Sequence, residues 1–185
     1  GDALLNLAYE TAAKAFGMEV VDARVARAFA VLAKKAGVYG MVGGQVVDVE
    51  SEKSDDCPIT REKLDFIYRL KTGALIESSM MIGAILAGAS SDEVSRVEQI
   101  AAKLGLAFQI QDDVLDVTST LEVLGKPVGS DEKNNKATYV TIEGLDKAVS
   151  DVERISKEAE EQLDDLGYDD AFLKELFEYL IHREK

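Results

Sequence analysis

The sequence has few of the residues that β-rich proteins use. Its 185 residues include two prolines and no tryptophan, and aromatic residues make up 6%. Residues that favour helices, above all alanine, leucine, glutamate and lysine, recur throughout. The length is that of one domain, and a hydrophobic share of 46% is enough for one core. We therefore predict a single all-α domain over residues 1–185.

Cysteine and histidine are almost absent. Cys57 is the only cysteine and cannot form an internal disulfide, and His182 stands alone near the end of the sequence. No Cys/His cluster has the spacing of zinc ligands. We interpret His182 as a surface residue, and the cysteine usage fits a reducing compartment, so we expect a cytoplasmic protein.

Positive charge is also scarce. Lysine and arginine number 21 against 35 acidic residues, which gives a formal net charge of −14 at pH 7. Because such a chain repels a polyanion and has no basic stripe, nucleic-acid binding is not expected. An acidic protein can still bind phosphates through a bridging metal ion.

Signals for secretion or membrane insertion are missing. No charged segment followed by a short apolar core opens the chain, so we expect no secretory signal. The most apolar stretch, residues 73–89, contains Glu77 and is short for a membrane span. This stretch predicts a buried core helix. The chain begins at Gly1 within an expected helix, as a truncated chain would.

Apolar periodicity predicts a series of helices. We expect them over residues 3–16, 23–38, from an N-cap at Thr60 onward, 91–117, 148–166 and 170–182. The helix over 23–38 is expected to continue through Gly40, Gly43 and Gly44 to Val49. Such glycines mark close backbone packing or close approach to a ligand, and both interpretations stay open. Residues 118–137 lack periodicity, which is typical of a functional or disordered loop.

The segment from Phe108 to Asp116, FQIQDDVLD, gathers three carboxylates. Helical spacing puts Asp112 and Asp116 on one face with Asp113 beside them. Because like charges repel and the flanking residues are apolar, a cation should sit there. Clustered carboxylate oxygens suit Mg²⁺, which also binds phosphates. A solvated acidic patch is the alternative.

This segment resembles the second aspartate-rich motif of the trans-isoprenyl diphosphate synthases, the farnesyl and geranylgeranyl diphosphate synthases. Further segments match that family in order: GDALL (1–5), GGQVVD (43–48), KTGAL (71–75), and GKP (125–127) leading through Gly129 and Asp131 to KATY (136–139). The resemblance covers the whole chain. It implies an isoprenoid-synthase-type helical bundle around a central cavity, lacking its N-terminal helices.

The resemblance also implies chemistry. It assigns Mg²⁺ to Asp112, Asp113 and Asp116, as ligands or water-mediated supports. The allylic diphosphate would be held by lysines, each of which alone would be interpreted as a solvated surface charge: Lys71, Lys126 and Lys136. Cations placed where negative charge develops lower the barrier to ionisation.

The resemblance gives four further residues a place near the substrate. Thr72 and Gln109 match a polar pair whose oxygens stabilise the allylic cation, and Lys71 lies beside them. Taken alone, Thr72 is equally a hydroxyl bonded to a helix carbonyl and Gln109 a packed helix residue. Asp48 matches an acid that pairs with basic residues, and Gln45 could face the cavity beside it. We expect Asp48 and Gln45 to orient the residues that contact the substrate and not to contact the substrate themselves.

The chain departs from the family in two ways. The family's first aspartate-rich motif, the basic residues that bind isopentenyl diphosphate and the residues that set chain length lie upstream of Gly1–Leu5 and are missing. We therefore expect the chain alone to be inactive and the parent protein to be a head-to-tail prenyltransferase that makes farnesyl or geranylgeranyl diphosphate. Ser130 replaces a lysine that many relatives carry in the glycine-rich loop.

Three other functions stay open at this point. A terpene cyclase of the same fold would ionise an allylic diphosphate without a second substrate. A non-catalytic partner subunit usually loses the aspartates and lysines that are present here. A helical scaffold would bind no diphosphate. The multi-faced apolar helices between Ala3 and Val38 predict a homodimer, as is usual in the family.

Overall fold

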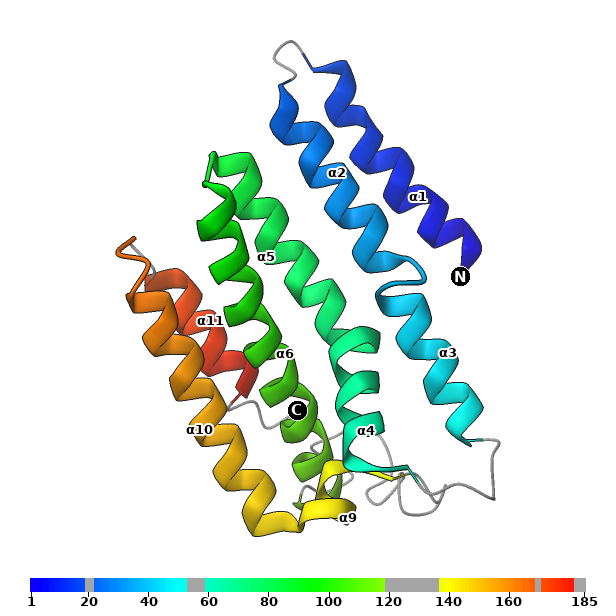
Figure 1. The fold of residues 1–185 in the computed structure, drawn as a ribbon, viewed down its shortest axis with the longest axis vertical. Coiled ribbons are helices and arrows are strands. Elements are labelled where there is room, and N and C mark those ends of the chain that lie inside the picture. The colour runs from blue at the N-terminus through cyan, green and yellow to red at the C-terminus, as the bar shows by residue number, and fades with distance from the viewer. Residues whose placement is uncertain (19–21, 53–58, 119–136, 169–170, 182–185) are drawn as a thin grey trace.

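The helices of the chain lie side by side with their axes roughly aligned (Figure 1). The structure, a computed structural model, describes residues 1–18, 22–52, 59–118, 137–168 and 171–181. Its helices are α1 (Asp2–Ala13), α2 (Ala23–Ala36), α3 (Met41–Glu52), α4 (Arg61–Tyr68), α5 (Ala74–Ala87), α6 (Ser91–Thr118), α9 (Tyr139–Glu143), α10 (Leu145–Asp164) and α11 (Ala171–Ile181). A 3₁₀ turn, η1 (Lys14–Gly17), follows α1, and a π-helical turn, η2 (Arg69–Gly73), joins α4 to α5. No strand occurs in these ranges, which confirms the all-α prediction.

Helix α6 is the central element. From α1 at one edge the helices follow in the order α2, α5, α6 and α10, with α11 beside α10 (Figure 1). The main core joins α6 to α4, α9, α10 and α11, and a smaller core joins it to α2 and α5. Small residues such as Ala101 and Ala107, both 0% exposed, let neighbouring helices approach α6 closely. The segment FQIQDDVLD therefore lies on the central helix of the bundle.

Local signals set several helix ends. The side chain of Thr60 accepts a hydrogen bond of 3.3 Å from the backbone N–H of Lys63, which confirms the N-cap of α4. Gly167, with φ of +74°, lies just past the end of α10, where glycine is favoured. The short helix α9 was not predicted, although Thr138, whose side chain accepts a hydrogen bond from the backbone N–H of Thr141, is of a residue type favoured at N-caps.

The expected continuation of the second helix to Val49 is wrong. Helix α2 ends at Ala36, Gly37 adopts an extended conformation, and α3 begins at Met41. The turn brings the backbone of Gly40 so close to that of Lys35 that a Cβ on Gly40 would lie 1.9 Å from the Lys35 carbonyl oxygen. Glycine is needed at this turn because any other side chain would collide with the preceding helix.

The continuous helix formed by α4, η2 and α5 passes through the middle of the bundle. From Arg61 to Ala87 it is long and apolar enough, by length and composition alone, to cross a membrane, and core helices meet the same criterion. It packs against α2 and α3 on one side and α6 on the other (Figure 1). Such packing on both sides is that of a core helix, in line with the prediction for residues 73–89.

A buried ion-pair cluster holds this helix to its neighbours. Lys35 of α2 contacts Glu77 of α5 and lies 2.6 Å from a carboxylate oxygen of Glu98 of α6. Glu77 is only 2% exposed. Burial alone lowers the pKa of Lys35, but its hydrogen bonds to Glu77 and Glu98 outweigh burial and raise that pKa above its ordinary value. The charged cluster therefore fixes α2, α5 and α6 together.

Candidate functional site

The Lys71–Thr72 pair lies on the π-helical turn η2, where the helix of α4 and α5 is locally widened. Turns of this kind occur frequently at functional sites. Helix α3 approaches the turn so closely that a Cβ on Gly44 would lie 2.3 Å from the backbone nitrogen of Lys71. Close backbone packing is thus the structural role of Gly44, one of the two interpretations left open for these glycines.

On its other side, η2 packs against α6. A Cβ on Gly105 would lie 3.0 Å from the Cα of Gly73, so these two glycines bring the helices together at what we call the glycine contact. The two motifs GGQVVD and KTGAL therefore converge with α6 at η2. Periodicity cannot reveal this convergence, because it depends on the packing of three separate helices.

Lys71 is held by a carboxylate from α3. Its ammonium nitrogen lies 2.5 Å from Oδ2 of Asp48, whose residue is 4% exposed, whereas the Lys71 side chain is 34% exposed. The pair thus has a buried anion and a cation that reaches the surface of the site. Gln45, which is half-buried, lies one helical turn before Asp48 on α3. The supporting role expected for Gln45 and Asp48 stays a prediction.

The aspartates of α6, Asp112, Asp113 and Asp116, form what we call the acidic turn, and they differ in how deeply they are buried. Asp112 is half-buried, whereas Asp113 and Asp116 are 7% and 2% exposed. Gln109, one turn before Asp113 on the same helix, is half-buried. Buried carboxylates are costly unless they meet donors or cations, so their partners decide what this turn can do.

Asp113 meets two donors within the fold. Its Oδ2 accepts hydrogen bonds from the hydroxyl group of Tyr68 on α4 and from the backbone N–H of Tyr139, the latter at 2.7 Å. Tyr139 is the first residue of α9. The middle aspartate of the motif therefore ties α6 to two other helices.

The contact between Tyr68 and Asp113 also shows which part of α6 lies beside Lys71. The helix formed by α4, η2 and α5 runs antiparallel to α6 (Figure 1). The Tyr68–Asp113 contact and the glycine contact therefore enclose a bracketed stretch on each helix, residues 68–73 on the first and 105–113 on α6. On the helix formed by α4, η2 and α5, the bracketed stretch contains Lys71 and Thr72. On α6 it contains Gln109. The segment that carries Lys71 and Thr72 therefore lies alongside the segment of α6 that contains Gln109.

The donor set at the acidic turn fits magnesium of the substrate-bridging kind. In the described parts of the chain no three acidic, histidine or cysteine side chains converge on one point. Mg²⁺ usually takes one or two carboxylates and completes its shell with water and substrate phosphates. Asp112 and Asp116 lie one helical turn apart on α6, a spacing compatible with this mode of binding.

Two of the expected diphosphate ligands cannot be placed. Lys126 and Lys136, together with the segment from Gly125 through Ser130 to Asp131, lie outside the described residues, as does His182. Their roles stay predictions.

Sequence reasoning missed a polar cluster around Tyr139. Its hydroxyl group donates a 2.6 Å hydrogen bond to Asp151 of α10, and the guanidinium carbon of Arg61 lies 4.0 Å from the centre of its ring. Burial and the bond to Asp151 raise the pKa of Tyr139 to about 12. Asp151 also contacts Lys147 and Arg154. The only sequence signal for this cluster was the place of Tyr139 at the end of the KATY motif.

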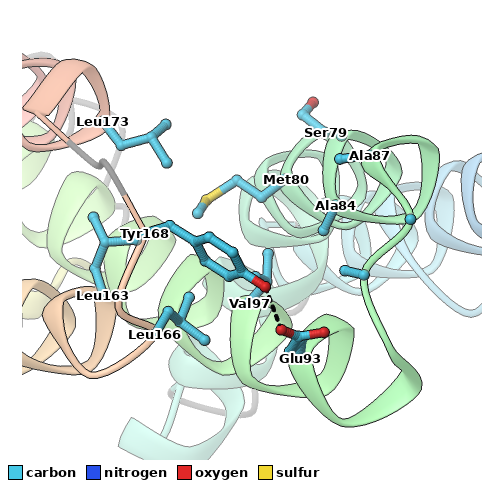
Figure 2. A pocket seen from close by; sticks show the side chains of 13 residues that line it. Ser79, Met80, Ala84, Ala87, Glu93, Val97, Leu163, Leu166, Tyr168 and Leu173 are labelled. Carbon is cyan, nitrogen blue, oxygen red and sulfur yellow. Dashed lines mark hydrogen bonds between the residues drawn. The ribbon is translucent and has the colours of Figure 1, made fainter.

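A separate pocket of about 550 Å³ lies toward the N-terminal end of α6. Figure 2 shows Leu163, Leu166 and Leu173 on one side of it and Met80 and Ala84 on the other, with Tyr168 donating a hydrogen bond to Glu93. Among the described residues that line it, none is a lysine or arginine. This apolar pocket therefore lacks the cations that a diphosphate requires.

Comparison with known proteins identifies the family of the chain. The family model "Polyprenyl synthetase" matches residues 1–176. The chain is 44% identical to heterodimeric geranylgeranyl pyrophosphate synthase large subunit 1 of Arabidopsis thaliana, covering all of this chain and 50% of that protein. It is 41% identical to the chloroplastic geranylgeranyl pyrophosphate synthase of Catharanthus roseus, covering all of this chain and 51% of that protein.

Solved structures show the same fold. An FPP/GFPP synthase from Zymomonas mobilis superimposes with a TM-score of 0.81 at 29% identity, over 97% of this chain and 58% of that one. A Helicobacter pylori geranyltransferase complexed with magnesium and isoprenyl diphosphate gives a TM-score of 0.79 at 28% identity, over 97% and 57%. The chain belongs to the polyprenyl synthetase family, the trans-isoprenyl diphosphate synthases. It spans about half the length of the curated relatives that it matches.

Proposed function

We propose that this chain forms the allylic-diphosphate half of a Mg²⁺-dependent head-to-tail prenyltransferase. The reaction condenses isopentenyl diphosphate with dimethylallyl or geranyl diphosphate and releases diphosphate. Farnesyl or geranylgeranyl diphosphate is the product, and the chloroplast relatives, named geranylgeranyl pyrophosphate synthases, favour the longer one.

The observation that carries this proposal is the bracketed stretch next to the acidic turn. The segment with Lys71 and Thr72 runs alongside the segment of α6 that contains Gln109 and leads into the acidic turn, and this supports the proposal. A scaffold protein has no need for this combination, and a partner subunit that had lost catalysis would have no reason to keep it.

Each residue has a distinct task in the proposed reaction. Lys71, oriented by Asp48, binds the diphosphate and stabilises the negative charge that develops as the carbon–oxygen bond breaks. Thr72 and Gln109 stabilise the allylic cation through their oxygen dipoles without attacking it. Gln45, on α3 beside Asp48, supports the side of the site that carries Lys71 and Thr72. Lys126 and Lys136 are proposed to bind the same diphosphate.

Asp112 and Asp116 would hold the magnesium, with Asp113 beside them. Bound Mg²⁺ supplies neutralisation of the diphosphate leaving group. The chain's own contribution is to fix the carboxylates on a rigid, buried helix so that little reorganisation is needed when the substrate binds.

The decisive experiment compares this chain with a protein that also carries the family's first aspartate-rich motif upstream. The longer protein is expected to consume isopentenyl diphosphate and an allylic diphosphate in a Mg²⁺-dependent reaction, measured by product chromatography. The 185-residue chain is expected to bind inorganic pyrophosphate with Mg²⁺ in calorimetry and to form no product.

Different results would point to the alternatives. Consumption of allylic diphosphate without isopentenyl diphosphate would favour a cyclase. Absence of Mg²⁺-dependent pyrophosphate binding by the longer protein would favour a scaffold, and binding without turnover would favour a non-catalytic subunit. The cytoplasmic location stays a prediction, since the plant relatives are named as chloroplastic.

We further propose that a second copy of the chain covers α1. This helix buries none of its residues within the chain, and Leu4 and Leu7 are 72% and 54% exposed. Large apolar side chains exposed together on one helix are typical of an interface. One relative is named a heterodimeric large subunit, so a different partner is the alternative outcome.

The double variant Leu4→Glu/Leu7→Glu is therefore expected to shift the chain from dimer to monomer in sedimentation, because it buries charge in the interface. Phe172→Glu is the matched control, since Phe172 on α11 is 74% exposed and lies away from α1. A wild-type chain that sediments as a monomer would contradict the homodimer.

A further inference from the structure

Asp151 of α10 is a buried carboxylate that lies outside every motif matched to the family. It is 2% exposed, and its Oδ2 accepts a 2.6 Å hydrogen bond from the hydroxyl group of Tyr139. Two half-exposed cations also bind it: Arg154 donates a 2.9 Å bond to Oδ1, and Lys147 contacts Oδ2. Burial raises the pKa of Asp151, but the hydrogen bonds from its partners outweigh burial and hold that pKa well below its ordinary value. Asp151 is therefore an ionised acceptor inside the fold.

Tyr139 connects Asp151 to the acidic turn. Its hydroxyl group donates to Asp151 on α10, whereas its backbone N–H donates a 2.7 Å bond to Oδ2 of Asp113 on α6. The residue is 1% exposed, so water has little access to either bond. Because a tyrosine side chain has few rotatable bonds, Tyr139 links α10 to the acidic turn through one stiff group.

Helix α9, which begins at Tyr139, is held in place by its neighbours. It has five residues, and a helix this short is not stable by itself. On the side of α4, the guanidinium carbon of Arg61 lies 4.0 Å from the centre of the Tyr139 ring, and Arg61 donates a 2.7 Å bond to Glu143 at the end of α9. On the side of α10, the bond to Asp151 holds the same tyrosine. The position of α9 therefore depends on both α4 and α10.

We propose that Asp151 is a positioning residue for the diphosphate site, because through the hydroxyl group of Tyr139 it holds the start of α9 against the acidic turn. This inference rests on the proposed function, which assigns magnesium to the acidic turn and a diphosphate contact to Lys136 of the KATY motif that Tyr139 ends. Asp151 itself does not contact the substrate. Residues behind a metal or phosphate site commonly set its affinity by orienting the groups in front of them.

The experiment compares Tyr139→Phe and Asp151→Ala in this chain with Val152→Ala as the matched control. Val152 follows Asp151 on α10 and is 4% exposed in the main core, so its truncation destabilises the fold and leaves both bonds of Tyr139 in place. Thermal melting ranks the losses of stability. Calorimetric titration of inorganic pyrophosphate in the presence of Mg²⁺ reports the site, and amide hydrogen exchange reports whether the N–H at position 139 stays bonded.

Tyr139→Phe and Asp151→Ala are expected to weaken Mg²⁺-dependent pyrophosphate binding roughly three- to tenfold, the size of effect expected when the loss of one hydrogen bond is felt at the site. In both variants the N–H at position 139 is expected to exchange faster relative to the core amides of α10. Val152→Ala is expected to melt at a lower temperature and to keep the wild-type affinity. Asp151→Asn keeps an acceptor for the hydroxyl group of Tyr139, so it is expected to recover most of the affinity that Asp151→Ala loses.

Tyr139→Phe keeps the inference testable should Asp151→Ala fail to fold, because it removes a single oxygen atom and leaves Asp151 with Lys147 and Arg154. Two results would overturn the inference. In the first, Tyr139→Phe binds pyrophosphate with the wild-type affinity. In the second, Val152→Ala loses as much affinity as Tyr139→Phe, which would trace the effect to a general loss of stability. If wild type shows no Mg²⁺-dependent pyrophosphate binding, the proposed function fails, and exchange at position 139 still decides whether Asp151 holds the start of α9.

Discussion

Lys71→Ala is expected to lower kcat of the longer, active protein roughly 10²–10³-fold, the loss typical of removing one group that stabilises developing negative charge. It is also expected to destabilise the fold. Asp48 is 4% exposed and would lose its cation, which costs about 3–5 kcal/mol in a fully buried pair. Because Lys71 is a third exposed, solvent screening should reduce this to about 1–3 kcal/mol. Steady-state kinetics and denaturant unfolding measure the two effects.

Asp48→Asn separates these effects. An asparagine at position 48 needs no cation, so Lys71→Ala/Asp48→Asn is expected to regain most of the lost unfolding free energy and none of the activity. Recovery of activity in the double variant would show that Lys71 acts only by neutralising Asp48, and it would contradict the proposed contact with the diphosphate.

Gly44→Ala is expected to destabilise the chain by about 3 kcal/mol, near the upper end of the usual cost of overpacking. The added Cβ would lie 2.3 Å from the backbone nitrogen of Lys71 and 2.8 Å from the carbonyl carbon of Leu70. Backbone atoms cannot rotate away, so α3 must move from η2. Since misplacing a substrate-binding group by about 1 Å can cost 10²-fold, kcat should fall as well. Unfolding in denaturant and kinetics of the longer protein test this.

Gly83→Ala provides the matched control. Gly83 lies within α5, and a Cβ there meets no atom within 4 Å. Alanine is the better helix former, so this variant should gain about 0.5–1 kcal/mol with activity unchanged. Equal losses of unfolding free energy from Gly44→Ala and Gly83→Ala would contradict the prediction, because they would show that the close approach of α3 to η2 does not exclude a larger residue at position 44.

Some elements could be predicted because their signals are local. The N-cap at Thr60, the ends of α6 and the amphipathic pattern of α10 each depend on residues within a few turns of one another. The break between α2 and α3 could not be predicted in the same way. A glycine-rich stretch is compatible with a helix or a turn, and the close approach of Gly40 to the Lys35 backbone decided between them.

In the candidate site, too, features with a local sequence signal could be predicted and features that depend on contacts between helices could not. The motifs at residues 43–48, 71–75 and 108–116 identified the family and the residue types for magnesium and diphosphate. They did not reveal the π-helical turn, which lies in close backbone contact with both flanking helices. Nor did they show that Asp113 bonds to Tyr68 and Tyr139. Neither tyrosine carries a sequence signal for that contact.

The sequence by itself determined that the protein is helical, that it belongs to the polyprenyl synthetase family and which face of α6 carries the carboxylates, because composition, motif order and helical periodicity are properties of the chain alone. Only the tertiary structure decided how the three carboxylates differ. Asp113 and Asp116 are buried whereas Asp112 is half-buried, and Asp113 accepts hydrogen bonds from α4 and α9. Contacts between helices distant in sequence leave no periodic trace in either one.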